Sequence, residues 1–196
     1  MAPRFLPILS LLLLTASAAH AVELHIRFDA LERMLGDQVF SEEGRRYVKG
    51  DKKTKCNFAY LESPKIMGEA GRIRIQARFT GRSALNMFGQ CVGVGDAFNV
   101  VITAAPQYKD GNLRLQDVRV ASDGKNGFYI RRVCAAMTES LGRDFKYPLA
   151  DTAKATLEDP GGQPSYKREV KKFNVTGITV SNDALVLVVD FELTVK

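Results

Sequence analysis

The sequence contains few of the residues that enzymes use as bases or metal ligands. It has no tryptophan, three cysteines and two histidines. One histidine, His20, lies in an apolar N-terminal segment, so His25 is the single histidine of the remaining chain and a serine or cysteine nucleophile lacks its usual base. The cysteines lack the spacing of zinc ligands, and no G-x-S-x-G sequence occurs. We therefore expect no catalytic residues, no metal site and no cofactor.

Long apolar runs are lacking beyond the N-terminus. Residues 1–21 combine Arg4, an apolar run from Phe5 to Leu14 and the small-x-small sequence Ala19-His20-Ala21, which is typical of a cleaved signal peptide. The run is too short to span a bilayer, and no cysteine near the cleavage point offers a site for lipid attachment. We expect that residues 1–21 are removed and that residues 22–196 form one exported, soluble domain without a lipid anchor.

Acidic residues are fewer than basic ones. The chain has 28 lysines and arginines against 22 acidic residues, a formal net charge of +6. In an exported protein, a moderate excess of this kind favours lipid headgroups or polysaccharide as anionic partners, and it is equally typical of solvated strand faces. We expect no nucleic-acid partner and keep an anionic membrane surface as a candidate partner.

The three cysteines would enter an oxidising compartment, where two are normally bridged. Cys134 lies in "RRVCAAM", on the apolar face of an expected helix, and we expect it to be buried and reduced. The predicted disulfide is therefore Cys56–Cys91, although the sequence leaves the other pairings open.

Helical spacing of apolar residues occurs in two segments. The first helix is expected within Phe28 to Val48, and the second within Phe128 to Leu157, where Pro148 should break or kink it. The residues that carry this spacing are Phe28, Leu31, Met34, Leu35 and Val39 in the first segment, and Ile130, Cys134, Met137, Leu141 and Phe145 in the second.

Strand alternation is clearest in "GRIRIQARFTG", where apolar and polar residues alternate strictly. The glycine-rich residues 89–96 are expected to bend into a strand that starts near Phe98, and residues 185–195 should form a long closing strand. The expected order is a helix, three or four strands, a long broken helix and two strands. Residues 50–55 and 159–164 are expected to be loops.

The stretch "AAPQYKDGNLRLQDVRV" predicts a hairpin around the two-residue turn Asp110-Gly111. That register pairs Pro106 with Leu115, and it implies that the strand on the other side of Pro106 has ended or bends away. The apolar alternation then shifts by one residue near Gln116-Asp117, and again near Thr176-Gly177. Two such bulges favour a strongly curved sheet.

The combination of "GRIRIQARFTG", this hairpin and a helix ending in "KYPLAD" resembles the YceB-like periplasmic lipoproteins, which belong to the tubular lipid-binding (TULIP, or BPI-like) superfamily. The resemblance implies an α+β fold, a highly curved antiparallel sheet wrapped around a long kinked helix as a TULIP-like half-barrel, here with an N-terminal helix. It also implies a periplasmic protein that holds a lipid or another amphiphile, and it supplies no catalytic residue. The lipobox cysteine of the family is missing. The most specific match is A-x-P-x-Y…G-x-L-x-L-x-D-V, formed by Ala104, Pro106, Tyr108, Gly111, Leu113, Leu115, Asp117 and Val118.

The apolar residues of the strand and helix faces allow two interpretations. They could line an apolar groove between sheet and helix, or they could interdigitate as a filled core, in which case the protein would be an envelope interaction or structural protein without a ligand. The arginines of "GRIRIQARFTG" likewise fit either lipid headgroups or a solvated strand face. The sequence specifies neither ligand nor oligomeric state. The candidate ligand-binding residues are Ile73, Ile75, Phe79, Phe98, Val100, Leu113, Leu115, Met137, Leu141, Phe145, Leu187, Val189 and Phe191.

Overall fold

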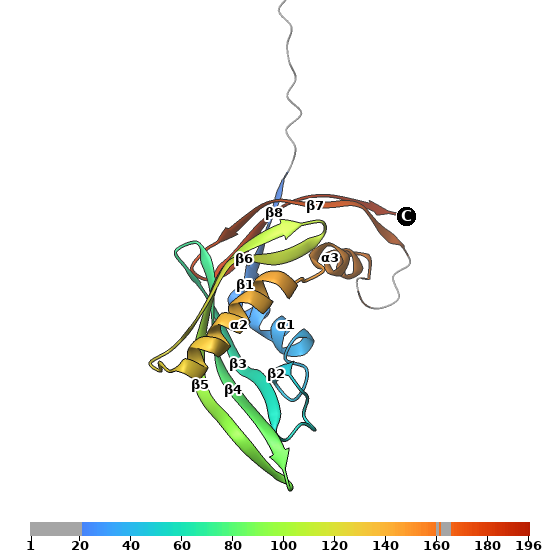
Figure 1. Ribbon diagram of the computed structural model, residues 1–196. Helices are drawn as coiled ribbons and strands as arrows, with labels where there is room; N and C mark the ends of the chain where they lie inside the picture. The colour runs from blue at the N-terminus through green and yellow to red at the C-terminus, as the bar shows by residue number, and fades with distance from the viewer. Residues whose placement is uncertain (1–20, 160, 162–165) are drawn as a thin grey trace, which may run out of the picture.

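The computed structural model describes residues 21–159, 161 and 166–196 of the chain. The predicted signal peptide lies outside the described residues except for its last residue, as does most of the expected loop at residues 159–164. Figure 1 shows the elements in chain order: β1 (Val22–Arg27), α1 (Phe28–Gln38), β2 (Arg45–Lys49), β3 (Asn57–Glu69), β4 (Arg72–Met87), β5 (Gln90–Lys109), β6 (Asn112–Ser122), α2 (Phe128–Asp144), α3 (Leu149–Glu158), β7 (Arg168–Val180) and β8 (Ala184–Val195).

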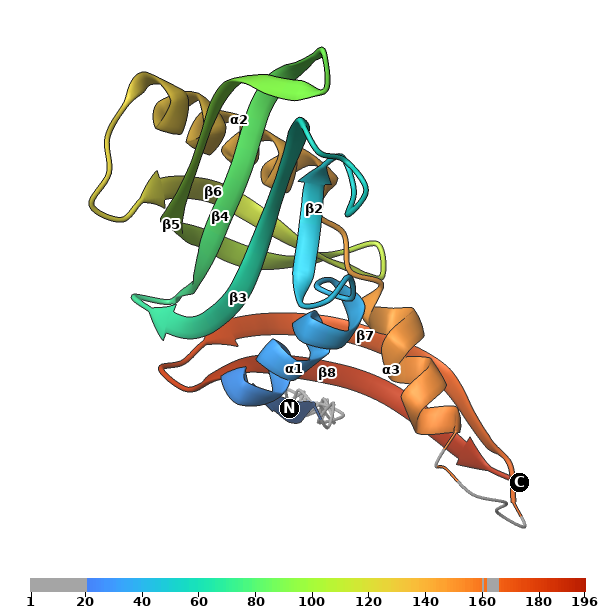
Figure 2. The same ribbon diagram turned by 90° about the horizontal axis from the view of Figure 1, so that it is seen from below.

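The strands form two antiparallel sheets. Five strands in the order β2-β3-β4-β5-β6 make a curled half-barrel, and three in the order β1-β8-β7 make a second sheet. Helix α2 lies along the half-barrel and packs against β6, whereas α1 packs against β3 and α3 against β7. Figure 2 shows both sheets, with α2 against the half-barrel and with α1 and α3 beside β7 and β8. The expected α+β half-barrel with a long broken helix is confirmed.

The sheets meet at the ends of two hairpins. Gly68, near the end of β3, lies so close to the β7–β8 turn that an added Cβ would be 1.8 Å from the carbonyl oxygen of Ser181. A side chain larger than hydrogen therefore does not fit at Gly68 without movement of the backbone. This contact sets how closely the two sheets approach each other.

The β5–β6 hairpin has the predicted register. Pro106 pairs with Leu115 and Tyr108 with Leu113, around a turn in which Asp110 and Gly111 have φ angles of 51° and 78°. On the other side of β5, pairing with β4 begins only at Ala104. Pro106 therefore lies beyond the end of β4, where its missing N–H costs no ladder hydrogen bond, as predicted.

Bulges account for the curl of the sheets. The predicted bulge in β6 lies between Gln116 and Arg119 and includes Asp117, whose φ is 48°. The second predicted bulge interrupts β7 between Val175 and Gly177. The ladders contain further register shifts in β2, in β3 and near the start of β7. Each extra residue adds bend and twist to its strand.

Pro148 separates α2 from α3, as predicted. The linker before it is held on the sheet, because Tyr147 and Leu113 exchange two backbone hydrogen bonds of 2.8 and 3.0 Å. Leu149, at the start of α3, is buried. The break therefore turns the chain from the half-barrel toward β7, and it allows the two helical pieces to pack on different sheets.

The expected element list was incomplete in its first half. Helix α1 ends at Gln38, residues 45–49 are strand β2, and β1 and β3 were not expected. Five strands, not three or four, lie between α1 and α2. The sequence shows no clear strand alternation for these elements, because β1 and β2 are short. In β3, a bulge around Ser63, whose φ is 54°, interrupts the alternation.

The glycine-rich residues 89–96 do not bend into a strand, because all but the first already belong to β5. At Gly93 an added Cβ would be 2.3 Å from the carbonyl oxygen of Ser83 on β4. The glycine therefore allows the backbones of β4 and β5 to approach closely across the ladder. The expectation of a bend at residues 89–96 was wrong, because these residues are paired in a strand.

Two apolar clusters fill the interior. The first core joins residues of the three-stranded sheet, such as Leu185 and Leu187, to residues of β3, β4, β6, α1 and α3. The second core lies between the half-barrel and α2, and includes Phe79, Phe98 and Val100. Ile75 packs against both clusters, so the two cores are continuous.

The predicted disulfide Cys56–Cys91 is present, and it ties the residue before β3 to the β4–β5 hairpin. Cys134 is free and buried on α2, as predicted, and burial raises the pKa of its thiol. None of the helices that the structure describes is long and apolar enough to cross a membrane.

Candidate functional site

The candidate ligand-binding residues are distributed over both cores. Leu113, Leu187 and Val189 are buried in the first core with Ile73, and Phe191 packs at its edge. Ile73 and Leu113 come from the half-barrel and Leu187 and Val189 from the three-stranded sheet, and Leu187 has no exposed surface. Ligand contact by these residues stays a prediction.

The second core holds the candidate residues that face α2. Phe79, Phe98, Val100 and Met137 are buried there, and Leu141 packs against them from the same helix. The rings of Phe79 and Phe98 are 5.0 Å apart between centroids, so this part of the half-barrel is filled by side chains. The remaining candidates lie apart from this contact: Ile75 packs between the cores, Leu115 is buried on β6, and Phe145 is half-buried just after α2.

The concave face of the half-barrel continues past the end of α2. Along the β4–β5 ladder, the pair Leu85 and Val92 follows Phe79 and Phe98 on the same face of the sheet, because side chains alternate with a period of two. Helix α2 begins at Phe128, and Figure 1 shows the β4–β5 hairpin projecting beyond this point. Leu85 is 74% exposed as a result, so an apolar sheet face lies open to solvent.

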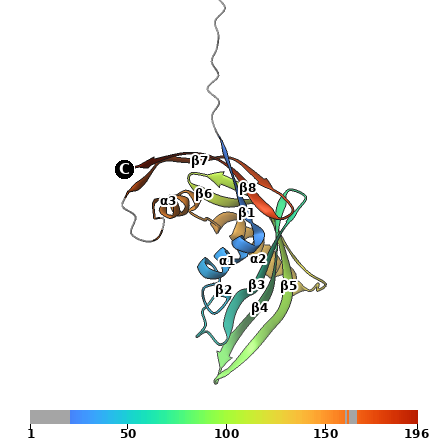
Figure 3. The same cartoon turned by 180° about the vertical axis from the view of Figure 1, so that it is seen from behind.

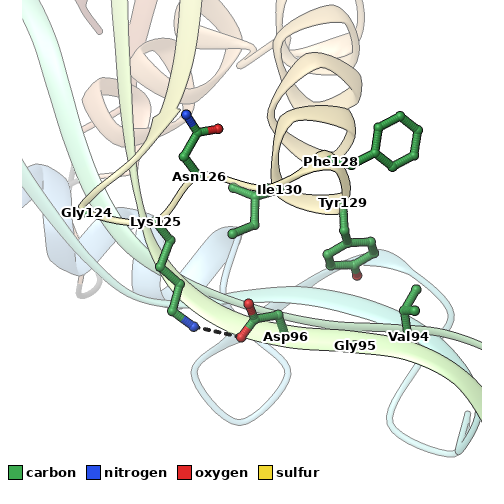
Figure 4. Close-up of a pocket in the computed structure, with 10 residues that line it drawn as sticks. Val94, Gly95, Asp96, Gly124, Lys125, Asn126, Phe128, Tyr129 and Ile130 are labelled. Atoms are coloured by element: carbon green, nitrogen blue, oxygen red, sulfur yellow. Dashed lines mark hydrogen bonds and ion pairs between the residues drawn. The ribbon is translucent and has the colours of Figure 1, made fainter.

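An open pocket of about 560 Å³ lies where this face meets the start of α2. Val94, Gly95 and Asp96 of β5 form one wall, the loop at residues 124–127 forms another, and Phe128, Tyr129 and Ile130 of α2 close it (Figure 4). Its volume is within the roughly 300–1,000 Å³ that is usual for small-molecule sites.

The polar side of the pocket is an ion pair between Asp96 and Lys125. The Nζ of Lys125 lies 2.8 Å from Oδ1 of Asp96 and also donates to the carbonyl oxygen of Ala97 at 3.1 Å. The hydrogen bond from Lys125 lowers the pKa of the Asp96 carboxyl, with a further contribution from the Ala97 N–H. In Figure 4 this pair lies on one side of the pocket, and Val94 and Tyr129 lie on the other.

Tyr129 contributes an aromatic wall because the neighbouring strand leaves room for it. An added Cβ at Gly81 would be 3.2 Å from the Tyr129 hydroxyl and 2.6 Å from the ring of Phe79. Burial raises the pKa of Tyr129, and the nearby Asp96 charge raises it further, so its hydroxyl stays protonated at neutral pH. The pocket therefore has an apolar side, a charged pair and a neutral hydroxyl.

A second open pocket, of about 470 Å³, lies between α1 and β3. One of its two acidic residues, Glu32, accepts hydrogen bonds from the N–H of Ile66 at 2.7 Å and from Lys65 at 3.1 Å. This carboxylate thus fastens α1 to the strand that follows the β3 bulge. Because the Glu32 carboxylate already bonds to β3, we assign this second pocket a structural role.

The arginines of β4 do not form an open cationic row. Arg74 binds Glu69 through two contacts of 2.9 and 3.1 Å, and Arg78 lies 3.8 Å from Glu62. Arg72 donates to a backbone carbonyl oxygen of β6 at 2.6 Å. Neighbouring acids and carbonyls therefore offset the positive charge of this face, which fits the interpretation as an ordinary strand surface.

Sequence reasoning missed the residues at the open end of the half-barrel. The available signal was the alternation of Leu85 and Met87 on one strand and of Val92 and Val94 on the next, within the segment 83–95, which carries no charged residue. The expected bend at residues 89–96 obscured that alternation. Asp96, Lys125 and Tyr129 had no sequence signal, because only the fold brings them together.

The comparisons with known proteins found a likeness only among solved structures. No family model matches the chain, and no curated protein matches it. A crystal structure of a lipopolysaccharide binding protein is similar over 89% of this chain at 8% sequence identity, with a TM-score of 0.27. The chain spans half the length of that structure. Membership of the YceB-like family stays a prediction from the sequence.

Proposed function

We propose that this protein binds a lipid or another amphiphile without changing it chemically, and that it does so as an exported periplasmic protein. The observation that carries the proposal is the apolar concave face that runs, uncovered, into the pocket at the start of α2. A monomeric protein rarely leaves a contiguous apolar face in water unless it binds something there.

The pocket suits an amphiphile because its two sides differ. An apolar chain can lie against Val94 and Phe128, where it covers surface that is now exposed. A polar end group can contact the Asp96–Lys125 pair or the Tyr129 hydroxyl at the edge. The proposed role is therefore binding in an orientation fixed by one charged pair.

The predicted groove residues extend this site inward. The pocket ends at Ile130, which belongs to the second core together with Phe79, Phe98 and Met137. A longer apolar chain would enter only by displacing these side chains, and an unbranched methionine accommodates such a change better than a branched residue. We propose that the pocket is the entrance and that the groove between sheet and α2 opens when a ligand is bound.

The proposal of export is supported by the N-terminal sequence pattern and by the disulfide. A Cys56–Cys91 bridge is stable in an oxidising compartment and rare in a reducing one. The absence of catalysis is also part of the proposal. The Asp96 carboxylate is held by Lys125 and the Ala97 N–H, which makes it a poor base.

One observation favours the alternative, an envelope interaction protein without a ligand. Val100 and Leu187 have no exposed surface, so both cores are closely filled. In that case the open apolar face would bind another protein, and the groove would never open.

The deciding experiment is native mass spectrometry of the protein purified without detergent from an exporting host, followed by organic extraction and lipid analysis. We expect a stoichiometric adduct that extraction removes. Val94→Glu should abolish the adduct, whereas Val195→Glu should retain it, because both valines are about equally exposed, at 60% and 58%, but only Val94 lines the pocket. A bare mass together with no binding of a fluorescent fatty acid would favour the alternative.

A further inference from the structure

Phe88 stands at the tip of the β4–β5 hairpin with its side chain fully exposed. It forms a two-residue turn with Gly89, and the φ angles of the two residues are 53° and 83°. Ala70 and Asp110 occupy the same position in the other two hairpin turns of the half-barrel. Asn, Asp and Gly tolerate a positive φ there, but a bulky residue is strained.

This phenylalanine contributes little to the stability of the chain. A fully exposed aromatic ring buries no surface, and its backbone conformation is unfavourable for its residue type. A residue that is costly in the folded chain and packs against nothing there is expected to act in contact with another surface.

The ring is part of a larger apolar tip. Leu85 and Met87 on β4 and Val92 on β5 are exposed beside it, on one face of the hairpin. No charged residue occurs from Ser83 to Gly95. Figure 3 shows the β4–β5 hairpin projecting away from the other elements, at the opposite end of the molecule from β7 and β8.

The tip of the β4–β5 hairpin is held in a fixed conformation within the chain itself. The β4–β5 ladder runs without a register shift to the pair Met87 and Gln90, and the side chain of Asn86 accepts a hydrogen bond from the Gly89 N–H at 3.0 Å. The disulfide at Cys91 fixes the hairpin to the start of β3. Contact with a partner would therefore require little ordering of the chain.

Cations flank the apolar tip. Lys52, Lys53 and Lys55 lie in the loop between β2 and β3, which the disulfide holds next to the hairpin. Asp51, in the same loop, accepts hydrogen bonds from the Lys53 N–H and from Thr54, so its charge is used within the loop. Glu43 lies 3.8 Å from Lys52. Within residues 21–159, 161 and 166–196, neither Lys53 nor Lys55 forms an ion pair.

Arg132 adds a cation at the start of α2, where the helix stops covering the apolar face. Its guanidinium lies 5.8 Å from the ring centre of Phe128, at the start of α2. An apolar tip with cations beside it matches the chemistry of a bilayer surface that contains anionic lipids, because apolar side chains enter the interface while lysine and arginine contact the headgroups.

We propose that the β4–β5 tip docks this protein onto a bilayer that contains anionic lipids. Phe88 and its apolar neighbours enter the interfacial layer, and the lysines of the β2–β3 loop contact phosphate groups. Phe88 does not line the amphiphile pocket, so the docking does not rest on the proposed function. It does place the pocket, which begins at Val94 of the same hairpin, next to the membrane surface.

The absence of tryptophan from the chain provides a direct test. In Phe88→Trp, tryptophan emission comes from the tip alone. With vesicles of phosphatidylcholine and phosphatidylglycerol, we expect a blue shift and quenching by lipids brominated in their acyl chains. With phosphatidylcholine alone, both effects should be weak. Val195→Trp places the reporter at another exposed apolar position, near the C-terminus and away from the tip, and its emission should not change.

Flotation of the vesicles separates the contributions of the ring and of the lysines. Phe88→Asn introduces a residue that the turn prefers, so the variant should fold while its partition onto anionic vesicles falls by about tenfold or more, which corresponds to about 1.4 kcal/mol. Replacing Lys52, Lys53 and Lys55 with Gln should weaken binding and reduce its dependence on salt. Val195→Asn should float like the unchanged protein.

Three results would overturn the proposal. The unchanged protein could stay unbound with anionic vesicles, or Phe88→Asn could float as well as the unchanged protein. Alternatively, Phe88→Asn could convert a dimer into a monomer without any vesicle binding, in which case the tip joins two copies of the chain. Retention of amphiphile binding by Phe88→Asn would show that the pocket acts independently, so failure of docking and failure of the proposed function can be told apart.

Discussion

Leu85 and Phe79 lie on the same face of strand β4, yet Leu85 is 74% exposed and Phe79 is 1% exposed. The difference arises because α2 covers the sheet face at Phe79, whereas Leu85 lies beyond the N-terminal end of α2 and is left uncovered. One continuous apolar face therefore serves as core at one end and as a contact surface at the other. The pocket and the hairpin tip both lie on the part of this face that α2 leaves uncovered.

Substitutions at the first residue of two hairpin turns should change the free energy of unfolding in opposite directions. Phe88 and Asp110 have nearly the same φ, 53° and 51°, and each precedes a glycine in a two-residue turn. Phe88→Asn should raise the free energy of unfolding and Asp110→Phe should lower it, each by about 1 kcal/mol, because Asn and Asp tolerate a positive φ better than a bulky residue does. Urea unfolding measures both. Equal stability of all three proteins would show that the turn carries no strain.

Much of the fold could be predicted from the sequence where one periodicity dominates. The alternation in β4 and β8, the helical spacing in α2 and the Asp110-Gly111 turn all follow local rules, and their register was correct. The bulges in β6 and β7 were also predictable, because each shifts an otherwise regular pattern by one residue. These elements are specified by neighbouring residues along the chain.

The missed elements depend on contacts between distant segments. Strand β1 is mostly exposed and forms because it pairs with β8 at the other end of the chain. The Asp96–Lys125 pair joins residues on a strand and a loop that no local pattern links. Most of the predicted ligand-binding residues are buried, and their contact with a ligand stays a prediction. The open surface lies beyond them, where the length of α2 decides what is covered.

Two glycine substitutions should have opposite effects. Gly68→Ala should destabilise the protein by about 1–3 kcal/mol, since its Cβ would be 1.8 Å from the carbonyl oxygen of Ser181 and the two sheets would have to separate. Gly36→Ala should stabilise it by about 0.5–1 kcal/mol, because Gly36 lies in α1 with no atom near the added Cβ. Thermal unfolding of both variants tests this. A tolerated Gly68→Ala would mean that the sheets are not in close contact.

Acid should loosen the open ends of β7 and β8. Hydrogen bonds from Lys171 and then Lys196 lower the pKa of Glu169 from 4.5 to about 2. A carboxyl whose pKa is lower in the folded state stabilises the fold above the unfolded pKa, and it loses this contribution as the pH falls from about 4.5 to about 2. Glu169→Gln should therefore flatten the pH dependence of stability in this window.

Removing the disulfide should destabilise the whole protein and loosen the hairpin. The bridge joins residues separated by 35 positions, and the chain-entropy model gives about 4 kcal/mol for a loop of this length. The double variant Cys56→Ser and Cys91→Ser should lower the free energy of unfolding by about 2–4 kcal/mol, and amide exchange should become faster in β4 and β5 near the tip. Cys134→Ala is the control, because it removes the buried free thiol and should leave exchange at the tip unchanged. If exchange at the tip is unaffected by loss of the bridge, the ladder alone holds the hairpin, and the disulfide does not contribute to its stiffness.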